Sequence, residues 1–307
     1  MIRTSSLQMT GALKSLPFAN RLRQELGVRN REYAARHGLL MRESYGEQPV
    51  IWYLPSDDGM CHGNFIAESY QAIRENAGWS KRMEKVHAQA RHSLSREDRR
   101  WRELDSCNSS DALLMNIFCF PDTLNEQHVF DLLGVENGSL PDFGVRARVP
   151  LANSRVDHTE VDMRIGDLLV EAKLTELDFQ CSDAAVVEAY RDFAEVFEKR
   201  SLPRDGKRYV SYQLIRNVLA AHAMQCSFCV MADARRPDLQ EAWFAIMRCV
   251  RILDLRLRCK MITWQELAEG LPEQLQNFLA EKYGIAAGNS CFTFQNNAES
   301  EDLPLWT

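Results

Sequence analysis

The chain lacks the sequence features of membrane and secreted proteins. No apolar run reaches the roughly 18 residues of a membrane-spanning helix, and the first 25 residues contain no apolar signal-peptide core. These residues also lack acidic side chains before Glu25, as a transit peptide does, but a plain flexible N-terminus is the simpler interpretation. The nine cysteines are an odd number without framework spacing, which is typical of reduced thiols. We therefore expect a cytoplasmic protein with no membrane partner.

Repeats and an excess of positive charge are also missing. The net charge of −6 argues against a protein that coats nucleic acid non-specifically. At 307 residues, 45% hydrophobic and 26% charged, the chain fits one large globular domain or a domain with an extension. One basic stretch, residues 74–102, holds nine Lys or Arg against four acidic residues. It is either a solvated helical face or a phosphate-contacting surface with Arg99 and Arg100 as candidates.

Residues 158–175 have the pattern of a β-hairpin. Apolar residues alternate before Gly166-Asp167 (Val161, Met163, Ile165) and again after it (Leu168, Val170, Ala172), the period of half-buried strands. A Gly-Asp pair between such runs is a two-residue turn signal. If these two residues form the loop, position 165 pairs with position 168 and the rest of the register follows.

That register places charged side chains opposite one another. Asp162 is expected to face Glu171, and Glu160 to face Lys173. Directly opposed like charges destabilise a strand pair, so a cation between Asp162 and Glu171 is a natural explanation. Two carboxylates suit Mg²⁺ or Mn²⁺, whereas zinc fits poorly because no His or Cys shares this face. The competing interpretation is an exposed strand face whose charges are merely solvated.

The remaining pattern predicts an α/β fold with a mixed central sheet flanked by helices. We expect a mostly helical N-terminal extension over 1–104, with a helix at 64–93, a domain over 105–283, and a flexible tail over 284–307. In that domain, Ser109-Ser110-Asp111 begins a helix that ends before Pro121. The other predicted helices lie at 123–133, 183–200, 209–224 and 237–250. The predicted strands lie at 143–151, 158–165, 168–174, 226–232 and 256–262, and Thr263–Glu266 forms a capping box.

Asp162, followed by Glu171-Ala172-Lys173 at the end of an apolar strand, resembles the PD-(D/E)xK nuclease superfamily. The predicted element order agrees with the α-β-β-β-α-β core of these restriction endonuclease-like proteins. The phrases Ser109–Phe118 and Lys173–Glu176 look like a bacterial branch of restriction-type endonucleases. The resemblance covers roughly residues 105–265 and is most specific in the hairpin.

The resemblance implies a role for each hairpin residue. Asp162 and Glu171 would bind the metal with help from the backbone carbonyl of Ala172, and Lys173 would position or activate the attacking water. Where the superfamily has a proline before the aspartate, this chain has Val161, and a literal Pro-Asp occurs at Pro141-Asp142. We prefer Asp162 as the metal ligand because it lies within a strand, whereas Asp142 lies in a turn-like segment.

The helix expected at 209–224 carries a polar face that includes Gln213, Arg216 and Asn217. Several superfamily members place a glutamine on this helix near the metal, a role that Gln213 fits. Arg216 and Asn217 are candidates for contacting nucleic acid, Arg216 through a bidentate phosphate contact. A solvated polar stripe is the alternative.

Other candidates are weaker. Cys226 and Cys229, with His222 nearby, suggest a metal site only superficially, because period 2 sends the two thiols to opposite faces of a strand. Buried free thiols are the better interpretation. The upstream acid that some superfamily members use could be Glu126, Asp131 or Glu136, and the sequence does not choose among them.

The leading hypothesis is a Mg²⁺- or Mn²⁺-dependent nuclease that acts on DNA, with RNA as a further substrate candidate and restriction or genome defence as the expected context. The first rival is a catalytically silent nucleic-acid-binding or assembly module on the same fold. The second is an interaction protein whose hairpin carries only solvated charges. A homodimer is retained as a candidate assembly.

Overall fold

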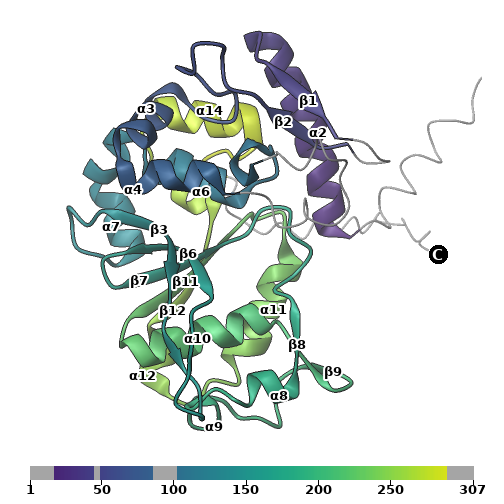
Figure 1. Ribbon diagram of the computed structural model, residues 1–307, viewed down its shortest axis with the longest axis vertical. Helices are drawn as coiled ribbons and strands as arrows, with labels where there is room; N and C mark the ends of the chain where they lie inside the picture. The colour runs from purple at the N-terminus through teal and green to yellow at the C-terminus, as the bar shows by residue number, and fades with distance from the viewer. Residues whose placement is uncertain (1–16, 45–48, 86–101, 289–307) are drawn as a thin grey trace, which may run out of the picture.

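The computed structural model describes residues 17–44, 49–85 and 102–288. Its central sheet has five strands in the order β12-β11-β7-β6-β3 (Figure 1). The strands are β3 (Pro141–Arg146), β6 (Glu160–Ile165), β7 (Leu168–Ala172), β11 (Ser227–Ala232) and β12 (Cys259–Thr263). β3, β6 and β7 are antiparallel neighbours, while β7, β11 and β12 run parallel. The predicted mixed sheet is therefore confirmed.

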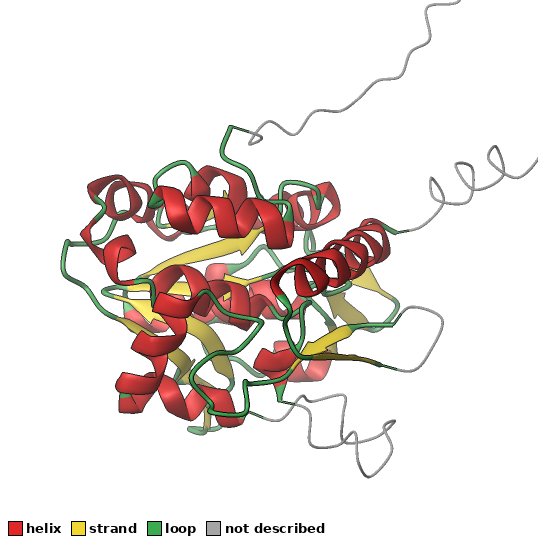
Figure 2. Ribbon diagram, turned by 90° about the horizontal axis from the view of Figure 1, so that it is seen from above, coloured by secondary structure: helices red, strands yellow, loops and turns green. Residues whose placement is uncertain are grey.

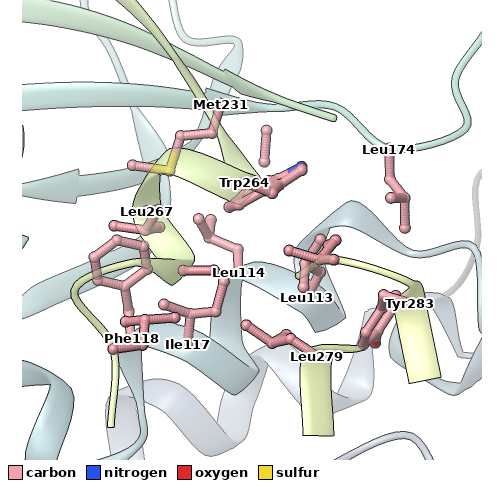
Figure 3. Packing of buried hydrophobic residues seen from close by; sticks show 14 of the residues in the cluster. Leu113, Leu114, Ile117, Phe118, Leu174, Met231, Trp264, Leu267, Leu279 and Tyr283 are labelled. Atoms are coloured by element: carbon pink, nitrogen blue, oxygen red, sulfur yellow. The ribbon is translucent and has the colours of Figure 1, made fainter. Parts of the chain in front are cut away.

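Helices cover both faces of this sheet (Figure 2). On one face, α6 (Ser110–Phe118), α13 (Trp264–Ala268) and α14 (Glu273–Tyr283) pack against Val170 and Met231 (Figure 3). On the other, α10 (Tyr212–Met224) and α11 (Pro237–Met247) pack against Leu169 and Val230. Strand β7 is buried along its whole length, because a central strand covered on both faces must be apolar nearly throughout.

The N-terminal part of the chain shares the first of these cores. Helix α2 (Phe18–His37) packs on α14, and its Leu26 and Tyr33 belong to the same cluster as Leu279 of α14. The other elements before the sheet are β1 (Met41–Glu43), β2 (Ile51–Tyr53), α3 (Ala67–Glu75), α4 (Ala77–Ser80) and the 3-10 helices η1 (Lys81–Glu84) and η3 (Glu103–Asp105). The boundary at residues 104 and 105 stays a prediction.

The hairpin register matches the sequence prediction for the three pairs next to the turn. Ile165 pairs with Leu168, Arg164 with Leu169 and Met163 with Val170, and Gly166 takes the left-handed conformation with φ 56° that a tight turn favours. The capping box at Thr263 and Glu266 is also present. Helix α7 (Gln127–Leu133) ends at Gly134 in a left-handed cap, after a 3-10 turn η4 (Pro121–Asn125) that the prediction had included in the helix.

The helix predicted at 183–200 is wrong. The segment forms β8 (Cys181–Asp183) and two single turns, α8 (Ala184–Val187) and α9 (Phe193–Val196). Between the turns, the Ala189 carbonyl accepts from the Ala152 amide and the Arg191 amide donates to the Pro150 carbonyl. These bonds to a distant strand replace helical ones, a tertiary effect that overrides the local apolar pattern.

Other boundaries shift for similar reasons. β10 (Arg208–Val210) pairs with β8 and with β9 (Arg204–Asp205), so the predicted helix at 209 begins only at Tyr212. A short helix, α12 (Leu253–Leu257), precedes β12 and takes the first residues of the strand predicted at 256. The helix predicted at 64–93 divides into α3, α4 and η1, and its last eight residues lie outside the described ranges. So do residues 289–307 of the predicted tail, whereas α14 ends at Gly284.

One long hairpin extends past the sheet. β4 (Val149–Pro150) pairs with β5 (Val156–Asp157) in the same register in which β3 pairs with β6, so Val149 faces Asp157 as Arg146 faces Glu160. The strand predicted at 143–151 is thus two consecutive strands of this hairpin, residues 141–165. Among the described residues no helix is long and apolar enough to cross a membrane.

Candidate metal-binding and catalytic site

Asp162 and Glu171 lie together in the middle of the sheet. One carboxylate oxygen of Asp162, Oδ2, accepts a hydrogen bond from the Ala172 amide at 2.8 Å, which brings Asp162 beside the residue that follows Glu171. Glu171 is in register with Val230, a member of the core on the α10 side. The Glu171 side chain therefore faces α10 and is only 2% exposed.

Lys173 completes this group just after β7. Its Nζ donates to Oε1 of Glu171 at 2.8 Å and lies 5.6 Å from the ring centroid of Phe179. Its backbone is fixed on both sides, because its amide donates to the Met231 carbonyl and its carbonyl accepts from the Trp264 indole. Both Glu171 and Lys173 are buried. The interpretation of the hairpin as a solvated charged face is therefore wrong.

Glu160 does not pair with Lys173, so that prediction is wrong. Its carboxylate instead binds Arg82 and Lys85, from η1 and the residue after it. The strand changes face near Asp162: Met163 packs in the α6-side core, whereas Val161 packs in the α10-side core. Gly144, at the position opposite Asp162, has φ 68°, and a Cβ there would overlap the Arg82 guanidinium. The glycine thus lets Arg82 reach Glu160 across the strand.

Helix α10 contributes Asn217 to the site. Asn217 Nδ2 donates to Oε2 of Glu171 at 2.8 Å, while its Oδ1 accepts two bonds from Arg216. Arg216 also donates to the Glu160 carbonyl. Asn217 and Arg216 are 0% and 4% exposed, so the polar face of α10 is not a solvated stripe. Asn217 orients Glu171 directly and Arg216 orients Asn217, and the nucleic-acid contact expected of both residues stays a prediction.

Gln213 lies in the first turn of α10 and is joined through the backbone to Phe179, the residue whose ring lies near Lys173. Its amide donates to the Phe179 carbonyl, and its buried Oε1 has no hydrogen-bond partner among the described residues. Two non-glycine residues with left-handed backbone, Gln180 and Ser211, flank this position with φ 60° each. Strained backbone of this kind clusters at functional sites, and an unpaired buried amide oxygen is a free ligand position.

Sequence reasoning missed Asp111 as an acid of the site. It begins α6, is 3% exposed and binds Arg82 at 2.6 Å and Lys85 at 3.2 Å. Its charge raises the pKa of Asp162, which places it in electrostatic reach of the hairpin. The only sequence signal was its position in the phrase Ser109–Phe118, which matched the superfamily resemblance.

The three upstream acids proposed from the sequence are placed differently. Asp131 is exposed and accepts a hydrogen bond from Gln127, and Glu136 is also exposed. Ser139, three residues after Glu136, contacts the Gly166 turn, the end of the hairpin opposite Glu171. Glu126 caps α7 without a contact to the hairpin carboxylates among the described residues.

Asp142 is exposed and pairs with Arg164, close to that same turn. The structure therefore brings Asp162, and not Asp142, next to Glu171. Arg99 and Arg100, the proposed nucleic-acid contacts in the basic stretch, lie outside the described residues. Cys226 and Cys229 are free buried thiols that belong to the two different cores, as expected from period 2.

The charges of the site perturb one another. Burial, then the neighbouring Glu171 and Asp111 carboxylates, raise the pKa of Asp162 well above its usual range. Burial would raise the pKa of Glu171 as well, but Lys173 and Arg216 outweigh it and lower that pKa. Burial would lower the pKa of Lys173, but Glu171, Glu176 and Asp162 together raise it. Lys173 is therefore an ammonium at neutral pH, and Asp162 is the carboxyl that lacks a cation.

The oxygen donors fit a hard divalent cation. Asp162 Oδ1 has no hydrogen-bond partner among the described residues, and each Glu171 oxygen accepts a single bond, which leaves lone pairs for a ligand. The described residues contain no group of three or more His, Cys, Asp or Glu side chains placed to hold a metal. Among the described residues, a metal cage made only of His, Cys, Asp and Glu side chains is therefore excluded. Mg²⁺ does not need such a cage, because it ordinarily binds one or two carboxylates and keeps several waters.

The mixed sheet, the helices on both its faces and the buried carboxylates define a restriction endonuclease-like protein. A family model described as "Restriction Endonuclease associating with ARP" matches residues 28–284, and the chain belongs to this family. Family membership points to a nuclease role with a nucleic-acid substrate. Neither the curated proteins nor the solved structures gave a significant match.

Proposed function

We propose that the chain is a PD-(D/E)xK-type nuclease that hydrolyses phosphodiester bonds of DNA with Mg²⁺ or Mn²⁺. The observation that carries this proposal is the group of half-buried Asp162 with buried Glu171 and Lys173, in which the ammonium of Lys173 binds Glu171 and Asp162 accepts from the next residue, Ala172. The family assignment supports the nuclease part of the proposal.

Asp162 and Glu171 are the residues that would hold the metal, with the Ala172 carbonyl and Gln213 Oε1 as further oxygen donors. A divalent cation bound there would neutralise the developing charge on the phosphoryl group and lower the pKa of an attacking water. Asn217 and Lys173 fix both Glu171 oxygens, which keeps the carboxylate in one orientation before substrate arrives.

Lys173 holds a proton at Nζ because the Glu171 carboxylate stabilises its charged form. We infer that it acts as a hydrogen-bond donor that orients the attacking water and the phosphate oxygen. Activation of the water by a neutral Lys173 amine would require loss of that proton against the charge of Glu171.

Asp162→Asn separates catalysis from folding. The amide still offers an oxygen to the Ala172 N–H but removes the charge that repels Glu171, so we expect equal or higher stability, by about 1 kcal/mol. Cleavage of plasmid DNA and calorimetric Mn²⁺ binding should both be lost. A variant that is as active as the wild type would exclude Asp162 as a metal ligand.

Lys173→Ala tests the second part of the site. Cleavage should be abolished while Mn²⁺ binding persists through Asp162 and Glu171. Wild-type protein that binds nucleic acid but cleaves no substrate with any metal would instead support a silent binding module.

The biological setting we propose is restriction or genome defence. The family description names an association with ARP, and we extend that association to this chain as a protein partner. Co-purification of the two proteins, with the cleavage rate measured with and without ARP, tests both points.

A further inference from the structure

The outer half of the long hairpin, residues 146–160, carries unbalanced positive charge. We call this segment the arm. Arg146 and Arg148 are both exposed, and no carboxylate in the described part of the chain forms an ion pair with either. Arg146 ends β3, the strand that pairs with the Asp162 strand β6, and Arg148 lies between β3 and β4 on the same arm.

The two arginines share one face of the arm. The residues between and after them, Ala147 and Val149, are buried in the α10-side core, and side chains alternate along a strand. Arg146 and Arg148 therefore point away from the core. His158, which the register places opposite Arg148, is also exposed.

The acids of the arm are already engaged. Asp157 accepts hydrogen bonds from the Tyr190 hydroxyl at 2.6 Å and from Thr159. Glu160 is bound by Arg82 and Lys85. The positive charges of Arg146 and Arg148 are therefore not cancelled by their own strand pair, and they are available to an anionic partner.

The arm leads directly to the proposed catalytic carboxylates. Arg146 faces Glu160, and Asp162 follows two residues later on the same strand, about 7 Å further along at roughly 3.3 Å per residue. Arg148 lies two residues further from Asp162 than Arg146 does. Arg146 and Arg148 thus lie two and four residues along the hairpin from Gly144, the position opposite Asp162.

The arm is held in place at its tip. The Ala152 amide donates to the Ala189 carbonyl at 2.9 Å, the Arg191 amide donates to the Pro150 carbonyl at 3.0 Å, and Leu151 forms a β-bridge with Tyr190. A free two-stranded ribbon can enter the major groove of DNA. A ribbon whose tip is bonded to the body of the protein cannot enter the groove. The DNA groups that the arm can contact are therefore the phosphates of the backbone.

We propose that Arg146 and Arg148 form a binding surface for the sugar-phosphate backbone of duplex DNA beside the bond that is cleaved. The proposal rests on the nuclease function for its substrate. Arginine binds phosphate oxygens in a bidentate manner, and such contacts position the duplex without reading its sequence.

The test is DNA binding by Arg146→Gln/Arg148→Gln in a Lys173→Ala background, which prevents cleavage. The affinity for a short labelled duplex should fall at every sequence tested, as measured by fluorescence anisotropy. The slope of log K against log salt should become shallower by about 1.8, because each phosphate contact contributes roughly 0.9.

Arg248→Gln/Arg256→Gln is the matched control. These arginines are also exposed but lie at the end of α11 and on α12, near the opposite edge strand β12. The control removes the same charge and should keep the wild-type slope. The thermal unfolding midpoints of both double variants should match that of the parent, because all four substitutions are on exposed side chains.

The outcomes separate this inference from the nuclease proposal. If wild-type protein cleaves DNA but the arm variant binds like the control, the arm inference alone is overturned. If nothing is cleaved but duplex binding depends on the arm, the phosphate contacts of the arm stand, while the catalytic proposal and the place of these contacts beside a cleaved bond both fail. Arm-dependent binding of RNA alone, or no binding of any nucleic acid, overturns the inference.

Discussion

Two buried lysines in this chain have opposite electrostatic surroundings. Lys173, at the end of β7, has Glu171 at 2.8 Å, and its pKa is raised. Lys282, near the end of α14, is 0% exposed and pairs with no carboxylate of the described residues. Burial lowers its pKa well below the usual range. Its Nζ donates to Asn30 Oδ1 at 2.8 Å and to the Gly63 carbonyl at 3.3 Å, and lies 3.7 Å from the Tyr53 ring centroid.

The difference shows that the partner decides the charge of a buried lysine. Burial favours the neutral amine in both cases, and the carboxylates near Lys173, Glu171 first among them, reverse that preference. A protein keeps a buried ammonium where it uses the charge. Lys282, surrounded by tyrosines and neutral oxygens, joins α14 to the N-terminal helix α2 through Asn30.

The largest expected effect is on cleavage by the matched pair Lys173→Met and Lys282→Met. Lys173→Met should reduce the cleavage rate by roughly a hundredfold or more, because it removes a group that acts on the reacting atoms. Lys282→Met should remain close to wild type. Initial rates on plasmid DNA at saturating Mn²⁺ measure both, and equal losses would remove the distinction between the two lysines.

The same pair should change stability in opposite directions. Lys173→Met leaves Glu171 buried without its counter-ion and should destabilise the protein by about 3 kcal/mol. Lys282→Met replaces an unpaired buried amine with an apolar chain of similar length and should stabilise it by about 1 kcal/mol. Urea unfolding at pH 7 measures both, and a destabilised Lys282→Met would mean that its hydrogen bonds outweigh its burial.

The pH dependence of stability provides a sharper comparison. The unfolded chain holds the Lys282 proton up to the ordinary lysine pKa of about 10.4, whereas the folded protein releases it at a lower pH. The unfolded state therefore binds more protons in this window, and the Lys282 contribution to stability rises with pH. The slope between pH 7 and 10 should be shallower in Lys282→Met, and an unchanged slope would show that Lys282 stays charged.

The smallest effect on cleavage is expected for Asn30→Asp, which gives Lys282 the kind of partner that Lys173 has. The carboxylate should raise the pKa of Lys282, but it cannot donate the bonds that Asn30 Nδ2 makes to the Leu26 and Lys282 carbonyls. Stability at pH 7 should therefore fall by about 1–3 kcal/mol, and the pH slope attributed to Lys282 should disappear. A slope identical to that of the wild type would refute the comparison.

The sequence was most informative where one local pattern determined one local structure. The turn at Gly166, the register of β6 with β7 and the capping box at Thr263 follow from residues close together in the chain, and the structure confirms them. The family and the mixed sheet were also predicted correctly. The helix predicted at 183–200 failed because its backbone bonds to Pro150 and Ala152 come from far along the chain.

The candidate site shows the same difference between features set by local sequence and features set by long-range packing. The turn and the first pairs of β6 with β7 follow from local sequence and bring Asp162 near Glu171 and Lys173, although strand alternation ends at Asp162, where Val161 and Met163 pack in different cores. The packing of helices on the sheet sets the other contacts: Glu160 with Arg82 at Gly144, Asn217 with Glu171, and the approach of Asp111. These contacts join residues 29 to 78 positions apart, and their geometry depends on how the helices pack on the sheet, which no local pattern encodes.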